Sequence, residues 1–501
     1  MLKGDYMKIE TINSKTSNIV NILGQSAPIK VKIISIGKNP SIQGAIMYIE
    51  GLVDKNIINR DILNPLMIQV TSTIVLSNDT PSFLCSNYIT ADCSFTKDIQ
   101  EASKNIKNGN TLFIIENIED YVIIDTTGGA IRTVTDPMNE TSLRGSRAGF
   151  VENLEVNISL IRRNIKDPNL SIEKLVVGRR TQTDLALVYI KDLVNIEVLD
   201  ELRERLNSVD VDSITGTGAL IEFIDQNPYS PFPMYFATER PDRVTPNIME
   251  GKIAIILNGS PFVLTTPSLF IEFFHTVEDY NERIILANFI RMLRYIAVLA
   301  VMTLPSIYLT LIKYNGELIP VEFVVPVVQS RIGISLSPFM EILILEILME
   351  ILREGGLRLP TKIASTLSIV GGIIIGNAAV QSNMVSPTTL LVVGITVVTS
   401  FAVPTVDMSI SIRFLRFPML FLANSMGIMG IATGYTLFLL HLSSLENYGT
   451  PYMEFNFDEL KDTFIRAPLW KMNARPKIIS DRNVNRQTNF GNKFRRKKEN
   501  E

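Results

Sequence analysis

The chain has 501 residues, of which 46% are apolar and 20% are charged, and its formal net charge is −3. A typical soluble domain has about 25% charged residues, and the deficit here is concentrated, because only fourteen charged residues lie between Tyr295 and Leu445. This distribution excludes a single soluble enzyme and predicts a soluble region, a membrane block and a tail. The slightly negative net charge also argues against a nucleic-acid partner, which would require a basic surface.

The cysteines and histidines exclude two further classes of protein. Cys85 and Cys93 are too few for a disulfide framework. His275 and His441 lie far apart, and neither has a second ligand at a metal-binding spacing. We therefore expect no metal and no cofactor. The first residues lack the apolar run of a secretory signal, so we expect the N-terminal region to stay in the cytoplasm.

The first 290 residues alternate short β-rich apolar runs with helical patterns, which is typical of an α/β fold. Strands are predicted at 29–36, 44–49 and 111–124, and helices are predicted at 98–108 and 151–164.

A repeat runs through this region at an offset of 141 residues. AIMYIEGLVD, which begins at Ala45, aligns with ALVYIKDLVN, which begins at Ala186. The same offset places LFIIENIEDYVII on IAIILNGSPFVLT, so that Leu112 falls on Ile253. Because two matches share one offset, we predict a duplication that gives two similar subdomains, at 1–145 and 146–290.

Motifs of common enzymes are incomplete in this region. Gly216–Gly218 begins like a dinucleotide-binding loop, but Ile221 occupies the position of the third glycine. GSRAG at 145–149 has its serine one position too early for a nucleophile elbow. No P-loop motif occurs. We predict that the chain is not an enzyme and that this region binds partners or acts as a scaffold.

The segment Pro228–Val244, PYSPFPMYFATERPDRV, combines prolines, aromatics and clustered charges. Prolines fix φ and disfavour regular structure, so we expect a rigid extended loop. Rigid loops with aromatic and charged side chains are frequent contact surfaces. The alternative is a loop that ion pairs hold to its own domain. The charged residues concerned are Glu239, Arg240, Asp242 and Arg243.

A transmembrane helix needs about 20 mainly apolar residues. Tyr295–Ile312 meets this requirement, and the arginines before it place its start on the cytoplasmic side. Further spans are predicted at Thr388–Val403 and Phe417–Leu442. Phe323–Val328 is too short to span and is broken by Pro326, so we expect a re-entrant helix there.

The helical transmembrane domain is thus expected at 291–445, with four to six spans. After Leu445 the chain carries twelve basic and eight acidic residues and ends in RRKKENE. We expect this tail, 446–501, to be partly disordered and to lie in the cytoplasm beside anionic lipid.

Three glutamates, Glu346, Glu350 and Glu354, recur every four residues in an otherwise apolar helical pattern. They share one helix face, and carboxylates on such a helix cannot face lipid at low cost. Either this helix lies in the membrane interface, or its acidic face lines water.

The stretch Lys362–Ser386 combines small residues with uncharged amides. Gly372 and Gly376 belong to a ridge that allows helices to approach closely. Asn377 and Gln381 share a face, with Met384 close below, and a polar side chain in a span must meet another helix or water. A ring of identical helices with this face inward would form a polar pore with an apolar collar at Val380. The alternative is a set of amides that bond across a helix interface.

Five long or unusual runs of this chain are RGSRAGFVENLEVNISLIRRNI from Arg144, SPFPMYFATERPDRV from Ser230, GGLRLPTKIASTLSIVGGIIIGNAAV from Gly355, RFLRF from Arg413 and GTPYM from Gly449. Through these runs, from about Ser41 to Pro468, the chain resembles the A subunits of the GerA family of spore germinant receptors. Ser146 and Asn281 depart from the family pattern, which has proline and tyrosine there.

The resemblance implies an A subunit of a nutrient germinant receptor, which is a multi-pass protein of the inner membrane of the bacterial endospore. The N-terminal region of the family is two-lobed and faces the cytoplasm of the spore core. The implied partners are a B subunit that resembles amino-acid transporters and a C-subunit lipoprotein. Such A subunits are thought to form a homo-oligomeric ring whose opening releases monovalent cations and triggers germination.

Two functions follow as hypotheses. In the first, the chain is a subunit of a ligand-gated cation channel: Asn377, Val380, Gln381 and Met384 line the gate, Gly371, Gly372 and Gly376 allow bending, and Glu346, Glu350 and Glu354 attract cations. In the second, the chain is a non-conducting signalling scaffold, and the loop around Arg240 relays germinant binding from a partner subunit. An alternating-access carrier ranks below both, because the membrane block shows no inverted repeat.

Overall fold

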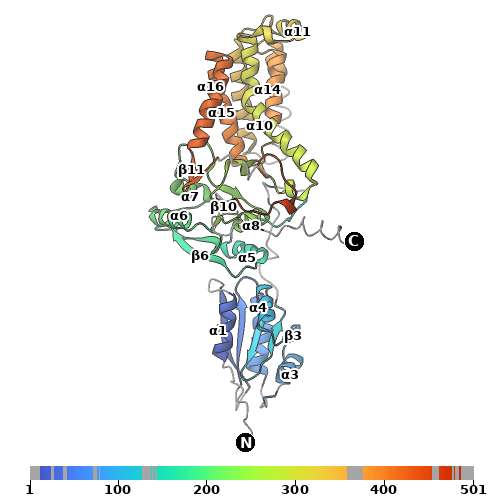
Figure 1. The fold of residues 1–501 in the computed structure, drawn as a ribbon, viewed down its shortest axis with the longest axis vertical. Coiled ribbons are helices and arrows are strands. Elements are labelled where there is room, and N and C mark those ends of the chain that lie inside the picture. Colours follow the sequence, from blue (N-terminus) through green and yellow to red (C-terminus); the bar gives the residue numbers. More distant parts are fainter. Residues whose placement is uncertain are drawn as a thin grey trace, which may run out of the picture. The chain divides into compact units, whose positions relative to one another are not determined.

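A computed structural model describes residues 12–23, 28–37, 42–70, 76–77, 79–126, 137, 140, 144–357, 376–453, 462–476, 479 and 485–486 (Figure 1). The chain divides into two compact units. The sheet unit comprises residues 1–225, 235–267 and 474–488, and the helical unit comprises residues 226–234, 268–473 and 489–501.

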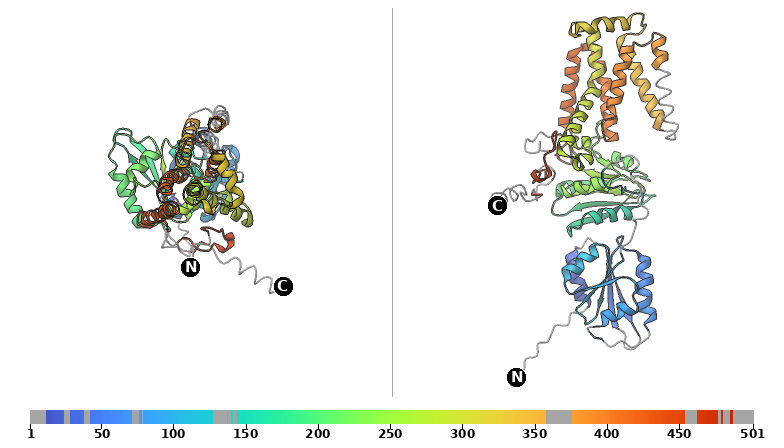
Figure 2. Two further views of the ribbon diagram at one scale, coloured as in Figure 1. Left: turned by 90° about the horizontal axis from the view of Figure 1, so that it is seen from above. Right: turned by 90° about the vertical axis from the view of Figure 1, so that its right-hand side faces the viewer.

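The first sheet of the sheet unit has five antiparallel strands in the order β1-β2-β4-β5-β3. Helices cover both of its faces, as the right-hand view of Figure 2 shows. The strands are β1 (Ile29–Ile36), β2 (Ile42–Ile49), β3 (Cys93–Thr96), β4 (Thr111–Ile115) and β5 (Tyr121–Ile124). The helices are α1 (Ile12–Leu23), α2 (Lys55–Ile57), the π-helical turns η1 (Ile58–Leu63) and η2 (Pro65–Gln69), α3 (Thr80–Asn87) and α4 (Ile99–Lys107).

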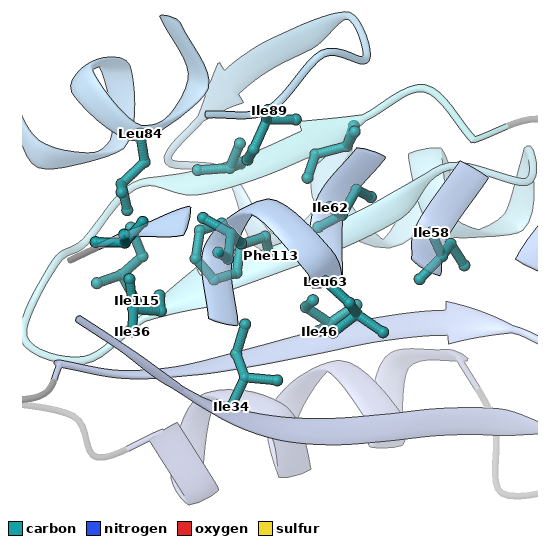
Figure 3. Packing of buried hydrophobic residues seen from close by; sticks show 14 of the residues in the cluster. Ile34, Ile36, Ile46, Ile58, Ile62, Leu63, Leu84, Ile89, Phe113 and Ile115 are labelled. Carbon is teal, nitrogen blue, oxygen red and sulfur yellow. The ribbon is translucent and has the colours of Figure 1, made fainter. Parts of the chain in front are cut away.

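Alternation of side chains along the strands divides the apolar core of this subdomain into two layers. On one face, α1 and α4 bury Ile19 and Ile106 against Ala45 and Met47. On the other face, η1, η2 and α3 cover a cluster with Phe113 at its centre (Figure 3). The sheet is therefore buried on both sides, which explains the continuous apolar runs in the sequence.

The second sheet has the same antiparallel arrangement, in the order β6-β7-β9-β10-β8. Its α5 and α8 pack on one face through Leu154 and Val244, and α6 covers the other, where Arg203 donates to the hydroxyl of Tyr189. The strands are β6 (Leu170–Val177), β7 (Thr183–Ile190), β8 (Phe236–Thr238), β9 (Ile253–Leu257) and β10 (Val263–Thr266). The helices are α5 (Leu154–Asn164), α6 (Ile196–Ser208), α7 (Thr217–Ile224) and α8 (Pro241–Met249).

The two sheets correspond strand for strand, but one of the two sequence alignments was wrong by one residue. β1 and β2 lie 141 residues before β6 and β7, as the repeat predicts. In the next strands Met47 pairs with Leu112, and the corresponding Val188 pairs with Ala254. Leu112 therefore corresponds to Ala254 and not to Ile253, since the second half has one extra residue before β9. Such a slip matters because it moves every side chain to the opposite face of the sheet.

The helical unit is built around α10 (Ile284–Lys313), which packs beside α14 and α15 (Figure 1). The other helices of this bundle are α11 (Val321–Arg331), α12 (Pro338–Leu357), α14 (Pro387–Ser400), α15 (Val406–Met426) and α16 (Ile428–Ser444). Residues 376–381 are also helical, and they directly follow residues that the structure does not describe. Smaller elements are η4 (Phe270–Phe274), α9 (Glu278–Asn281), η5 (Gly316–Leu318), β11 (Glu446–Asn447), β12 (Thr450–Pro451) and η6 (Leu469–Lys471).

Among the described helices, α10 alone has both the length and the apolar composition needed to cross a membrane. The predicted span Thr388–Val403 corresponds to α14, which is apolar but has 14 residues. The predicted re-entrant helix is α11, and it continues through Pro326 instead of breaking there. The number of spans therefore stays a prediction.

The prediction of one span at Phe417–Leu442 was wrong, because the chain turns back at Gly427 and forms α15 and α16. Gly427 has a φ of +62°, which side chains other than glycine rarely adopt. Glycines also allow the two helices to approach closely, since a Cβ on Gly430 would lie 2.0 Å from the carbonyl oxygen of Leu422. Hydropathy alone did not separate the two helices, because the turn itself consists of apolar and small residues.

Candidate functional site

The helix at residues 376–381 and α14 form the walls of an open groove of about 820 Å³ in the helical unit. α14 turns two different faces to its surroundings: Val393 and Thr396 are buried in the bundle, whereas Leu391 and Val398 are exposed in the groove. The groove is lined by Asn377, Val380, Gln381, Pro387, Leu390, Leu391, Gly394, Ile395, Val398 and Thr399.

The chemistry of this lining is apolar, with two amides. Asn377 and Gln381 are exposed and lie one helical turn apart, and Val380 is half-buried beside them. None of the ten lining residues is charged. The oxygens of two uncharged amides can contact a passing cation without binding it tightly. The branched apolar side chains beside them can exclude water when the passage is narrow.

Three of the four predicted gate residues thus lie together in the groove, and the fourth lies apart. The helix ends at Gln381, and Asn383 has a φ of +52°, so Met384 follows a turn instead of continuing the helical face. Met384 is exposed and is not part of the groove lining. The helical spacing placed Met384 on the same face, but Asn383 and the following Ser386-Pro387 are helix-ending signals that the spacing alone did not take into account.

Of the three glycines predicted to act as hinges, the structure describes Gly376. Gly371 and Gly372 lie outside the described residues. Gly376 is buried, and a Cβ built on it would lie 3.5 Å from Leu390 of α14. Gly376 therefore lies at the contact between residues 376–381 and α14. A small residue at such a contact allows two helices to approach closely.

The acidic face of α12 meets two arginines of α15. Glu346 is fully buried, and its carboxylate lies 2.7 Å from the guanidinium of Arg416, which is also buried. Glu350 pairs with Arg416 at 3.1 Å and with Arg413 at 3.5 Å. Glu354, one turn further along, is exposed. Glu346 and Glu350 therefore join α12 to α15 through ion pairs. The sequence contained both partners, but their pairing depends on the α15–α16 turn, which was not predicted.

A further buried carboxylate, which the sequence analysis missed, fixes the start of α14. Glu341 of α12 accepts hydrogen bonds from the amide of Ser386 (3.1 Å) and the hydroxyl of Thr389 (3.0 Å). Its other oxygen pairs with Arg331 at 2.7 Å. Ser386 caps α14 through the amide of Thr389 (3.2 Å). The network holds one wall of the groove against α12. Glu341 lies five residues before Glu346, outside the four-residue spacing that drew attention to the other glutamates.

The charged segment at 239–243 is less irregular than predicted. Glu239 and Arg240 join β8 to α8, Arg240 is the N-cap of α8, and residues 241–243 are its first helical residues, so the predicted extended loop is partly regular structure. Arg240 is buried and pairs with Asp242 through two hydrogen bonds, of 3.0 and 2.6 Å. It also donates to the carbonyls of Glu140 and Ser146 (2.8 and 3.2 Å). These contacts hold the segment within the sheet unit, and its role in subunit contact stays a prediction.

A second charge cluster, also missed in the sequence analysis, lies at the start of α10. Asp279 accepts from Arg294 (3.0 Å) and lies 3.4 Å from Arg291, and Asp462 pairs with Arg291 at 3.0 Å. Burial raises the pKa of Asp279, but Arg294 and Arg291 more than offset this and hold the pKa below its usual value. Burial dominates at Asp462 and raises its pKa despite Arg291. Arg466 donates to the carbonyl of Asp279. The cluster fastens residues 462–466 to α10.

Comparison with known proteins identifies the family. The family model described as Bacillus/Clostridium GerA spore germination protein matches residues 17–478. The chain belongs to this family. It is 37% identical over 471 residues to spore germination protein KA of Bacillus subtilis, which covers 93% of this chain and 86% of that protein. Identity to spore germination protein A1 of the same organism is 34%, over 77% of this chain and 81% of that protein.

A solved structure is also similar. It is the crystal structure of the N-terminal domain of the A subunit of the Bacillus megaterium spore germinant receptor GerK3, with 29% identity and a TM-score of 0.40. The match covers 53% of this chain and 99% of that domain. The relatives thus place this GerA-family chain in spore germination, as the sequence resemblance implied.

Proposed function

We propose that this chain is the A subunit of a nutrient germinant receptor and that its copies assemble into a ring-shaped cation channel in the inner membrane of the spore. The proposal places the sheet unit in the cytoplasm and the helical unit across the membrane in several spans. It includes a B subunit that resembles amino-acid transporters and a C-subunit lipoprotein as partners. The germinant opens the ring, and the efflux of cations starts germination.

The observation that carries this proposal is the groove between residues 376–381 and α14. Its surface is apolar, carries two amides and is open in a single copy of the chain. In a ring, each copy would turn such a surface toward a central passage. Val380 lies between the amides along the helix and is the apolar collar of the closed gate. The pairs of buried Glu346 and half-buried Glu350 with Arg416 act as a brace that joins α12 to α15.

The test is Val380→Ala, with Val325→Ala on α11 as the matched control. Both changes remove the same atoms, but Val325 is an exposed residue outside the groove. We expect spores with Val380→Ala to lose cations and germinate without nutrient, because a smaller collar lowers the apolar barrier, while Val325→Ala spores stay dormant. Full dormancy in Val380→Ala spores with normal amounts of the protein would contradict the channel.

The second candidate is a non-conducting scaffold that relays germinant binding from a partner subunit. The ion pairs of buried Glu346 and half-buried Glu350 favour it, because these carboxylates are then bracing groups and not cation attractors. In a scaffold, changes at Asn377 or Gln381 have little effect on the response to nutrient. In a channel, the two amide positions alter cation efflux directly.

A further inference from the structure

Nine residues, Gln226–Met234, belong to the helical unit although the residues on both sides of them belong to the sheet unit. We call this segment the strap. It leaves the sheet unit after α7 and returns to it one residue before β8, the edge strand that pairs with β10. The hydroxyl of Tyr235 donates to the carbonyl of Ile224 (3.1 Å), and both residues are buried. The strap is therefore a loop that is closed at its base within the sheet unit.

Prolines make the strap stiff and leave its carbonyls available as acceptors. Pro228, Pro231 and Pro233 have fixed φ angles and no backbone N–H group to satisfy. The carbonyl of Pro231 accepts from Ser411 of α15, and the carbonyl of Pro233 accepts from the hydroxyl of Tyr452 at 2.8 Å. The backbone of the strap is thus bonded to α15 and to the segment after α16, which belong to the same unit.

The turn after α16 adds polar contacts along the whole strap. These bonds join Asn227 to the carbonyl of Glu446 (3.0 Å), the side chain of Gln226 to the amide of Tyr448 (2.9 Å), and the carbonyl of Met234 to Asn447 (2.5 Å).

Phe232 anchors the centre of the strap at the end of α16. Its ring is 3% exposed and lies 5.7 Å from the ring of Phe438, 5.9 Å from that of His441 and 6.0 Å from that of Phe270. Two residues earlier, the hydroxyl of Ser230 lies 3.1 Å from Nε2 of His441. The last turns of α16 are therefore packed directly on the strap.

We propose that the strap transmits conformational changes of the second sheet to α15 and α16 and so controls the gate. The effect of the strap on the gate rests on the proposed channel. The coupling of the second sheet to α15 and α16 does not. The loop is stiff, its flanking residues belong to the sheet unit, and its bonds lie within the helical unit, so it offers a path along the chain by which a displacement of α7 or β8 reaches α15 and α16. The path extends from α15 to α12, because Arg416 of α15 pairs with Glu346 of α12.

The test is a double-mutant cycle on the purified full-length chain, read by hydrogen exchange of residues 438–444. Tyr235→Phe removes the hydroxyl that closes the base of the loop, and Phe232→Ala removes the anchor on α16. We expect Tyr235→Phe alone to raise exchange at 438–444 about fivefold to tenfold, and to cause no further change once Phe232 is alanine. Ser230→Ala is the milder variant, in case Phe232→Ala reduces the yield of folded protein. Tyr229→Ala is the control, since Tyr229 is fully exposed in the same segment.

Two outcomes overturn the proposal. In one, Tyr235→Phe leaves exchange at 438–444 unchanged. In the other, its effect is equally large with and without the Phe232 or Ser230 side chain. Failure of the channel is separate, because it appears in the cation efflux of Val380→Ala spores and not in hydrogen exchange. A strap that couples in a chain that does not conduct would support the scaffold.

Discussion

The two halves of the sheet unit have the same strand order but differ in the connection before the edge strand. In the first half, five residues, 88–92, join α3 to β3. In the second, eleven residues, 225–235, join α7 to β8, and nine of them are the strap. The two halves thus share their strand order, and the longer connection of the second half contains a segment that is bonded within the helical unit. The short connection of the first half serves only to join two elements of its fold. The long connection of the second half also carries the strap, which we propose couples the second sheet to α15 and α16.

Two smaller differences between the halves lie at a helix N-terminus and in the core. α4 is capped by Asp98, which accepts from the amide of Gln100 (2.9 Å). Arg240 occupies the corresponding position before α8 and bonds instead to Asp242 and to the linker between the halves. In the cores, Gly44 pairs with Ile115 and has Phe113 as its diagonal neighbour. The corresponding Leu185 pairs with Leu257 and has Ile255 as its diagonal neighbour.

The largest effect is expected when the difference between the halves is removed. Replacement of residues 225–235 by the five-residue connection 88–92 should abolish the response of spores to nutrient, because it deletes the strap and all its bonds. Protection of β9 and β10 from hydrogen exchange should persist, since the shorter connection serves the same fold in the first half. Spores that still respond normally to nutrient would show that the two connections are equivalent.

The next effect is expected at Arg240. Arg240→Ala leaves Asp242 without its partner and two carbonyls of the linker without their donor, which should destabilise the second half by about 3 kcal/mol. The measurement is the opening free energy of β8 and β10 by hydrogen exchange. Arg240→Lys is the matched control: it keeps the charge but not the two-pronged geometry, so a loss as large as that of alanine would assign the effect to geometry alone. A change below about 0.5 kcal/mol for alanine would contradict the tethering role.

A core exchange between the halves should have a smaller effect. A Cβ on Gly44 would lie 2.7 Å from Cε2 of Phe113, so Gly44→Leu should destabilise the first sheet by about 2 kcal/mol through overpacking. Phe113→Ile in the same chain should recover part of this loss, because the pair then matches Leu185 and Ile255. Opening free energies of β2 and β4 measure both effects. Strict additivity of the two changes would mean that these side chains do not compete for one space.

The smallest effect is expected at the cap of α4. Asp98→Ala should cost about 1 kcal/mol in the first half, because the amide of Gln100 loses its acceptor. Asp98→Asn keeps an acceptor and should be nearly neutral. The exchange of the first-turn amides of α4 distinguishes these outcomes, and equal losses for both variants would assign the effect to charge instead of capping.

Much of the sheet unit could be predicted from the sequence, because its signals are local. β1 was predicted with its bounds, and the helices α4 and α5 were predicted to within a few residues, since apolar periodicity and asparagine or aspartate caps mark them. The one-residue error before β9 arose because apolar strands look alike in either register. In the helical unit the amide face of Asn377 and Gln381 was found from its spacing. The partners of Glu346, the turn at Gly427 and the strap depend on contacts between residues far apart in the chain, which one sequence does not display.

The most direct test of the proposed channel is the mass of the intact complex extracted in mild detergent with its partners retained. Closed rings of four or more copies of this chain are predicted, because only a ring brings the grooves around one axis. One or two copies, with partner subunits still bound, would leave no axis for a pore and would contradict the channel.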